Sequence, residues 1–184
     1  MNAGLISARY ATALLGFAKE TNSLEEVYAE AKLLTLMFSK MSELRHMLEN
    51  PVVPHNEKRA LILNAAGGDV SQAFRVFTDL LLKNKRESQI QNIMLKFIDL
   101  YRAQKNIRHG VLTTAHEVDE ATEKRLIHLV TNQVGGTLEL EKIVDPEILG
   151  GFKLEVDHVR WDASISSQLK RIKNEYIERN RRIV

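Results

Sequence analysis

The spacing of apolar residues changes once along this chain, close to Lys105-Asn106, and this change constrains the fold more than any other feature. Before it, apolar side chains recur every three to four residues, which is the spacing of one face of an α-helix. After it, several segments alternate with a period of two, which is typical of a strand. We therefore expect two domains, a helical one over residues 1–105 and a small α/β one over residues 106–184.

The first domain is predicted to contain six helices joined by short turns. Ser23-Leu24-Glu25-Glu26 has the form of a capping box and predicts the start of the second helix. Asn50-Pro51 ends the third, because the residue before a proline avoids the helical region, and Gly67-Gly68 ends the fourth. Asp69 is a candidate cap for the fifth helix. The predicted helices span roughly residues 4–20, 24–38, 42–49, 54–65, 69–83 and 90–104.

The second domain is predicted to hold short strands and two helices. Residues 137–144, 152–156 and 159–161 read as strands, with a tight hairpin turn at Asp157-His158. A helix is expected over residues 120–133, capped by Asp119, and an amphipathic helix from Ile165 through Tyr176 ends the chain. The predicted fold class is therefore mainly α: a six-helix bundle, then a small α/β domain with a short mixed sheet and a C-terminal helix.

The sequence carries none of the common residue patterns of an enzyme. It contains no phosphate-binding loop, no dinucleotide-binding glycine motif, no cysteine and no pair of histidines at metal-ligand spacing. Asp145 and Glu147 flank Pro146, and paired carboxylates suit acid–base chemistry, but a turn at Asp-Pro explains them better. We predict no catalytic residue, no metal and no cofactor. The remaining enzymatic hypothesis is a pocket between the two domains that uses Asp145 and Glu147.

Two of the predicted helices, residues 4–20 and 69–83, are more apolar than a helix packed on one side needs to be. Such a helix requires an apolar stripe about 100° wide, whereas here apolar residues spread round most of the circumference. Either both helices are central in the bundle, or they share an exposed groove that accepts another apolar helix. Both readings stay open at this point. Ala11, Ala13 and Ala73 would let an incoming helix approach closely.

The end of the chain is basic. From Leu169 to Val184 there are six basic residues and two acidic ones, although the whole chain has a net charge of only +2. A solvated helix face, an acidic protein partner and a nucleic-acid backbone would each suit this pattern. No aromatic platform accompanies the charges, which weakens the nucleic-acid reading. A nucleic-acid-binding accessory protein is kept as the alternative function.

Three segments of the chain form a recognisable combination: Ser7–Leu14, Phe77–Arg86, and the region from Val144 to Ile165. Together they resemble the delta-subunit family of bacterial F-type ATP synthases, also called the oligomycin-sensitivity-conferring protein family. Ser7–Leu14 is similar to the opening of that family, and Phe77–Arg86 to the end of its fifth helix. Val144–Phe152, followed by Asp162-Ala163-Ser164-Ile165, resembles its C-terminal signature. The chain departs from the family at Trp161 and at the hairpin turn, where the family usually has Gly-Asp.

The resemblance implies a non-catalytic stator subunit that couples rotor torque to proton-driven ATP synthesis. The first and fifth helices would receive the N-terminal helix of an alpha subunit in the catalytic head. The C-terminal domain would bind the end of the b subunit in the peripheral stalk. Asp145, Pro146, Gly150 and Gly151 are expected to be a structural motif. The expected groove residues are Tyr10, Ala13, Leu14, Phe17, Phe74, Phe77 and Leu81.

The expected location follows from the same resemblance. No apolar stretch approaches the roughly 18 residues of a membrane span, and the start of the chain lacks the pattern of a secretory signal. We therefore expect the protein to stay where it is made. The resemblance implies a peripheral place on the cytoplasmic face of the bacterial inner membrane, with no nucleic acid bound.

Overall fold

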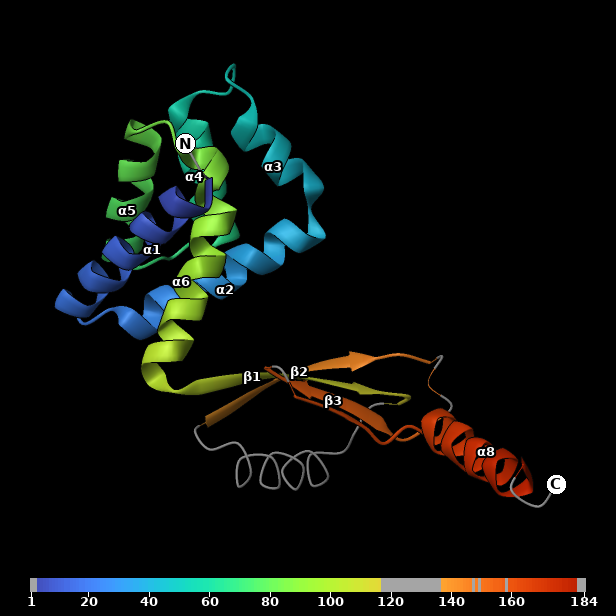
Figure 1. The fold of residues 1–184 in the computed structure, drawn as a ribbon. Coiled ribbons are helices and arrows are strands. Elements are labelled where there is room, and N and C mark those ends of the chain that lie inside the picture. Colours follow the sequence, from blue (N-terminus) through green and yellow to red (C-terminus); the bar gives the residue numbers. More distant parts are fainter. Residues whose placement is uncertain (1–2, 117–136, 147, 149, 158, 182–184) are drawn as a thin grey trace. The chain divides into compact units, whose positions relative to one another are not determined.

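The computed structural model describes residues 3–116, 137–146, 148, 150–157 and 159–181. The chain divides into two compact units, Met1–Gln104 and Lys105–Val184 (Figure 1). The predicted mainly helical chain with a small mixed sheet is confirmed. The helix predicted over residues 120–133 lies outside the described residues.

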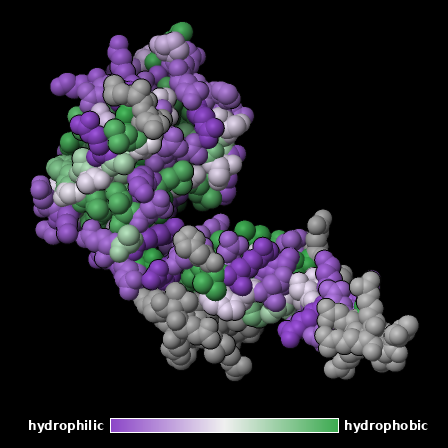
Figure 2. All heavy atoms as spheres, in the orientation of Figure 1, coloured by the Kyte–Doolittle hydropathy of each residue, from purple (hydrophilic) through white to green (hydrophobic). Residues whose placement is uncertain are grey.

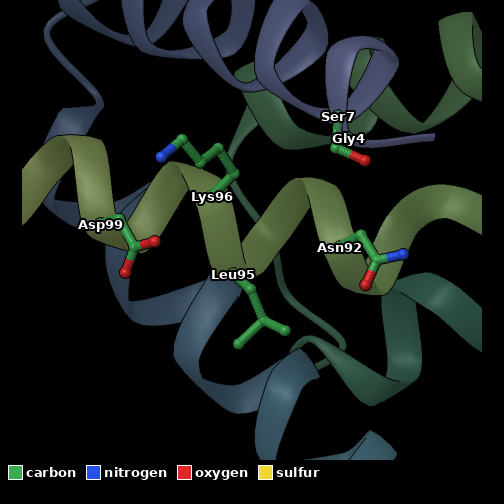
Figure 3. Close-up of a pocket in the computed structure, with 6 residues that line it drawn as sticks. All are labelled: Gly4, Ser7, Asn92, Leu95, Lys96 and Asp99. Carbon is green, nitrogen blue, oxygen red and sulfur yellow. The ribbon is translucent and has the colours of Figure 1, made fainter. Parts of the chain in front are cut away.

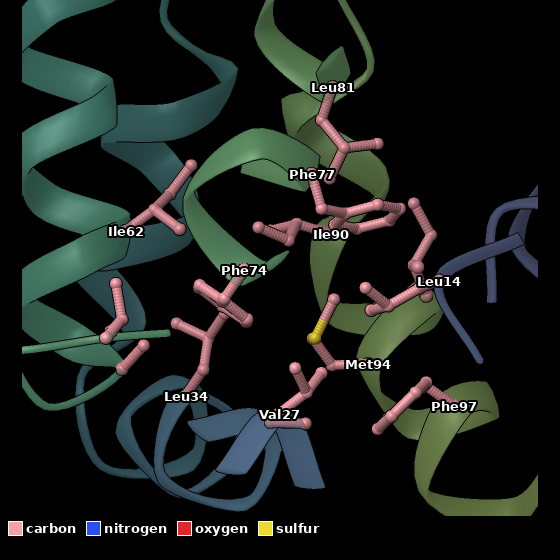
Figure 4. Close-up of a cluster of buried hydrophobic side chains, with 14 of the residues drawn as sticks. Leu14, Val27, Leu34, Ile62, Phe74, Phe77, Leu81, Ile90, Met94 and Phe97 are labelled. Carbon is pink, nitrogen blue, oxygen red and sulfur yellow. The ribbon is translucent and has the colours of Figure 1, made fainter. Parts of the chain in front are cut away.

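The first unit is built from helices that share one hydrophobic core. Buried side chains from the α-helices between Ala3 and Lys105 meet there, and Phe74 and Phe97 are fully enclosed (Figure 4). Burial of this apolar area is the main force that holds the helices together. The elements are α1 (Ala3–Glu20), α2 (Leu24–Lys40), α3 (Ser42–Glu49), α4 (His55–Ala65), α5 (Gln72–Lys83), the short 3₁₀ helix η1 (Glu87–Gln89) and α6 (Ile90–Lys105).

The start of α2 differs from the predicted capping box. Ser23 occupies the cap position, but its side chain caps nothing and hydrogen-bonds instead to the hydroxyl of Thr21, 2.7 Å away. The backbone N–H of Ser23 donates to the carbonyl of Ala18 at the end of α1, at 2.9 Å. Asn22, with φ 52°, makes this tight turn possible. The donor that Glu26 was predicted to accept from is therefore already used by the preceding helix.

The start of α5 also differs from the prediction, because Asp69 is not its cap. Ser71 is the cap, and its hydroxyl oxygen accepts from the backbone N–H of Phe74 at 3.3 Å. Asp69 is exposed and pairs with Arg75 at 3.0 Å. The carboxylate of the buried Glu30, on α2, accepts from both the backbone N–H and the hydroxyl of Ser71. The first turn of α5 is thereby tied to α2.

The second unit contains a four-stranded mixed sheet in the order β2-β1-β3-β4. β1 and β2 are parallel, and the other two pairs are antiparallel. Leu112, Leu154 and Val156 form its buried apolar cluster. The strands are β1 (Ile107–Thr114), β2 (Thr137–Val144), β3 (Phe152–Val156) and β4 (Val159–Asp162).

The strand β1 was not predicted, although it pairs with neighbours on both sides. Gly110 in its middle removes a side chain from the alternating pattern. A Cβ atom at this position would lie 3.0 Å from the side chains of both Leu140 and Val156, so a side chain there would crowd both neighbouring strands. The strand needs glycine at this position for close packing, and the glycine interrupts the apolar–polar alternation from which the other strands were predicted.

Short connections mark the remaining turns of this unit. Asp157 has φ 51° in the turn between β3 and β4, and its carboxylate accepts from Arg108 at 2.9 Å. His158, the other predicted turn residue, lies outside the described residues. A single residue, Asn106 with φ 53°, separates the end of α6 from the start of β1. The chain ends in α8 (Ile165–Arg181).

Candidate protein-binding surfaces

The structure separates the seven predicted groove residues into a buried and an accessible set. Leu14, Phe74, Phe77 and Leu81 are between 0% and 4% exposed and belong to the hydrophobic core (Figure 4). The accessible set comprises the half-buried Tyr10 and the exposed Ala13 and Phe17.

The accessible residues of α1 lie beside apolar residues of α5 that were not predicted. The ring of Tyr10 meets the ring of Phe77 edge to face, with centroids 6.3 Å apart, so α1 and α5 are in direct contact. Val76 and Leu80, on the flank of α5 next to Phe77, are each 44% exposed. Figure 2 shows apolar surface over α1 and α5. We call the following residues the α1–α5 surface: Tyr10, Ala13, Phe17, Val76 and Leu80.

The sequence does contain a signal for Val76 and Leu80, namely that both helices are apolar round most of their circumference. A helix with apolar residues round most of its circumference must expose some of them if another of its faces enters the core. The prediction selected the buried face of α5 instead of the exposed one, since spacing alone does not say which apolar face is covered. The two helices enter the core, and each also keeps exposed apolar residues, so the groove stays a prediction.

A second apolar surface lies on α8. All side chains from Gln168 to Ile177 are exposed. The large apolar residues among the first thirteen of the helix are between 42% and 67% exposed. These residues are Ile165, Leu169, Ile172, Tyr176 and Ile177.

The two halves of the C-terminal signature meet where α8 begins. The backbone N–H of Ile165 donates to the carbonyl of Gly150 at 3.0 Å, and that of Ala163 donates to Phe152 at 2.9 Å. Gly151 has φ 78°, and a Cβ atom on it would clash with the carbonyl oxygen of Ala163. Only glycine satisfies both the backbone conformation and the close approach at this position.

The first half of the signature is a turn that follows β2. The backbone N–H of Asp145 donates to the carbonyl of Thr114 at 2.9 Å, and Ile148 donates back to the carbonyl of Asp145 at 3.1 Å. Pro146 is exposed. Glu147, the second carboxylate of the enzymatic hypothesis, lies outside the described residues.

Asp162 holds Ser164, the residue that caps the start of α8: the hydroxyl oxygen of Ser164 accepts from the backbone N–H of Ser167 at 3.4 Å. One carboxylate oxygen accepts from the backbone N–H of Ser164 at 3.0 Å and from its hydroxyl at 2.6 Å. The other accepts from the hydroxyl of Ser167 at 2.8 Å. These hydrogen bonds, led by the one from the Ser164 hydroxyl, lower the pKa of Asp162 from 3.8 to about 2. Ser164 is fully buried, so the first turn of α8 is firmly attached to its unit.

The described part of the chain offers little to a metal or a small molecule. Among the described residues, no three histidine, aspartate or glutamate side chains come together to hold a metal ion. Nor does any described helix have the length and apolar character to cross a membrane. A shallow hollow of about 230 Å³ lies between α1 and α6 (Figure 3), smaller than a typical ligand pocket. Its lining residues are Gly4, Ser7, Asn92, Leu95, Lys96 and Asp99.

Exposed apolar helix faces on both units are typical of a protein that works by binding other proteins. Comparison with known proteins identifies the family to which this chain belongs. Residues 6–175 match the family described as ATP synthase delta (OSCP) subunit. The ATP synthase subunit delta of Phocaeicola vulgatus is 44% identical over the full length of both chains, and that of Bacteroides fragilis 43% identical. The chain belongs to the ATP synthase delta (OSCP) subunit family.

A solved structure shows the same fold. One chain of the Toxoplasma gondii mitochondrial ATP synthase hexamer matches with a TM-score of 0.64, covering 93% of this chain and 97% of that one, at 22% identity. Family membership makes this chain a non-catalytic stator subunit of an F-type ATP synthase, a peripheral part of a membrane complex. The predicted family, function and lack of catalysis are confirmed. The nucleic-acid alternative receives no support from these comparisons.

Proposed function

We propose that this chain fixes the catalytic head of the synthase to its peripheral stalk, with one unit binding each side. Residues 1–105, as a six-helix bundle, bind the N-terminal helix of an alpha subunit. Residues 106–184 bind the C-terminal end of the b subunit, on the cytoplasmic face of a bacterial inner membrane. The head then cannot turn with the rotor, and the torque drives ATP synthesis.

The α1–α5 surface is the observation that supports binding to the head. Phe17, Val76 and Leu80 present apolar side chains to solvent, and Ala13 leaves room for a second helix to come close. An apolar helix laid here would bury these side chains, at roughly 25 cal/mol for each Å² removed from water. The buried Leu14 and Phe77 would support the surface from beneath instead of contacting the partner.

Substitution of Leu80 tests the proposed surface. A peptide with the sequence of the alpha-subunit N-terminus should bind the full chain, and Leu80→Asp should weaken binding by more than about 2 kcal/mol, or about thirtyfold, because a carboxylate would face an apolar helix. Isothermal calorimetry measures this. Leu36→Asp is the matched control, because Leu36 is also a leucine with 44% exposure but lies on α2.

The expected result is a loss confined to Leu80→Asp, with unchanged thermal unfolding in both variants. Equal affinity of the two variants would remove the α1–α5 surface from the proposal. Leu14 and Phe77 are unsuitable for this test, since a carboxylate in the core would unfold the unit before binding could be measured.

A further inference from the structure

The exposed stripe of α1 carries opposite charges at its two ends. Arg9, Ala13, Phe17 and Glu20 are all exposed and follow one another at intervals of four, four and three residues, so they fall on one face of the helix. Ala13 and Phe17, which belong to the α1–α5 surface, lie between the cation and the carboxylate. The charge on α1 therefore gives this surface a direction.

The exposed stripe of α5 has the same spacing and carries its charge at one end only. Gln72, Val76, Leu80 and Lys83 are exposed and separated by four, four and three residues. Lys83 is the last residue of the helix, and the exposed Lys85 lies in the turn that follows. Both cations are thus at the C-terminal end of α5.

The two helices run in opposite directions, which brings the cations to the same end of the α1–α5 surface (Figure 1). Early in α1, Gly4 and Ser7 line one hollow with Asn92 near the start of α6, the helix that follows α5 (Figure 3). At the other end, Glu30 of α2 holds Ser71 at the start of α5. We call the three cations the basic end of the surface: Arg9, Lys83 and Lys85.

The basic end is not compensated by the protein's own carboxylates. None of its three cations forms an ion pair with a residue that the structure describes. The carboxylates nearest to it in sequence are already engaged, Asp79 with Arg59 and Glu87 with Lys58. A positive potential therefore remains at this end, where an acidic group of another molecule would be favoured.

The backbone at Lys85 indicates that its charge has a use outside the fold. Its φ of 54° is left-handed, and the residue after a helix in this conformation is usually glycine or asparagine. The turn is closed by the backbone N–H of Arg86, which donates to the carbonyl of Leu81 at 2.9 Å. Folding alone would favour glycine at this position.

We propose that the basic end sets the orientation of the helix that binds the α1–α5 surface. Resting on the proposed function, we infer that the alpha-subunit helix is amphipathic, carries acidic side chains near one end, and places that end against Arg9, Lys83 and Lys85. Its apolar stripe covers Phe17, Val76 and Leu80. Apolar contacts alone would allow the helix to lie in either direction, whereas the charges favour one of them.

Charge reversal in the full chain tests this proposal with the alpha-subunit N-terminal peptide encoded in the same genome. Lys83→Glu should weaken binding at least about fivefold at about 50 mM salt, mainly through slower association, and by less than about twofold at about 0.5 M salt, because salt screens exposed charges. Lys40→Glu is the matched control, because it makes the same charge change at the exposed last residue of α2 and should alter binding by less than about twofold.

Two further measurements separate orientation from folding. Lys85→Gly removes a charge but gives the turn a residue that it favours, so it should weaken binding at low salt without lowering the thermal unfolding midpoint. A photoreactive group at the acidic end of the peptide should attach near Lys83 and Arg9. Attachment near Glu20 instead would mean that the orientation is wrong.

The remaining outcomes distinguish this proposal from the proposed function. If Leu80→Asp weakens binding but Lys83→Glu and Lys85→Gly do not, the surface stands and the basic end has no role. If the peptide does not bind the wild type, or binds Leu80→Asp equally well, the proposed surface itself is wrong. Tighter binding by Lys83→Glu would mean that a basic end of the partner lies there. Equal losses in Lys83→Glu and Lys40→Glu would assign the effect to net charge alone.

Discussion

Glu30 shows how a single residue can connect two helices in a way that the sequence pattern does not reveal. It lies within α2 among charged and apolar neighbours, and nothing in its spacing marks it as a cap. Yet its carboxylate binds the first turn of α5, forty-one residues further along the chain. The partner is supplied by the tertiary fold, so local rules for helix caps selected Asp69 instead.

Replacement of Glu30 by glutamine should therefore destabilise the helical unit. Glu30→Gln replaces a charge-assisted pair of hydrogen bonds by a weaker one in a buried place, which should lower the free energy of unfolding by about 2 kcal/mol. Urea denaturation followed by circular dichroism measures this. Glu26→Gln, exposed on the same helix, should change stability by less than about 0.5 kcal/mol. Equal changes in the two variants would show that the cap contributes nothing.

At the scale of elements, the helices were better predicted than the sheet because their signal is local. Spacing, prolines and paired glycines placed the helix ends within a few residues of where they lie. β1 is held by partners on both sides, and Gly110 serves that packing at the expense of the alternating pattern. The predicted groove residues include buried and accessible ones for a related reason, since the pattern identified apolar faces on α1 and α5 but not which residues other helices cover.

The start of α8 should respond to acid through Asp162. Its pKa is lowered to about 2 in the folded chain, so its hydrogen bonds stabilise α8 fully above the ordinary value of 3.8. That contribution is lost as the pH falls from about 4 through about 2. Amide exchange at Ile165–Gln168 should therefore accelerate, relative to the intrinsic rate, over this range.

Asp162→Asn is the test of that assignment. Asparagine cannot ionise, so amide exchange at the start of α8 should lose most of its pH dependence between 4 and 2. Asp99→Asn, on α6 in the other unit, should leave that dependence unchanged. If Asp162→Asn kept the dependence, another group would have to control the first turn of α8.

At the scale of the whole molecule, two surfaces lie on two separate compact units. Because each surface belongs to its own unit, we expect the effects of substitutions on the two surfaces to be independent. The expected result is that Leu80→Asp weakens binding of the alpha-subunit peptide alone. Ile172→Asp, at an exposed apolar residue of α8, should weaken binding of a C-terminal fragment of the b subunit alone. The double variant should show both losses, each within about 0.5 kcal/mol of the single variant, measured by calorimetry. A larger deviation would mean that one unit senses what the other has bound.

The backbone between α6 and β1 consists of Asn106 alone. A long Gly- or Ser-rich linker would behave as a coil that stretches before it resists. A connection of one residue has almost no length to extend. A pulling force on either unit is therefore transmitted to the other through a few covalent bonds. A stator subunit must not move while the rotor exerts torque, and a connection this short allows the smallest displacement of one unit before the other resists.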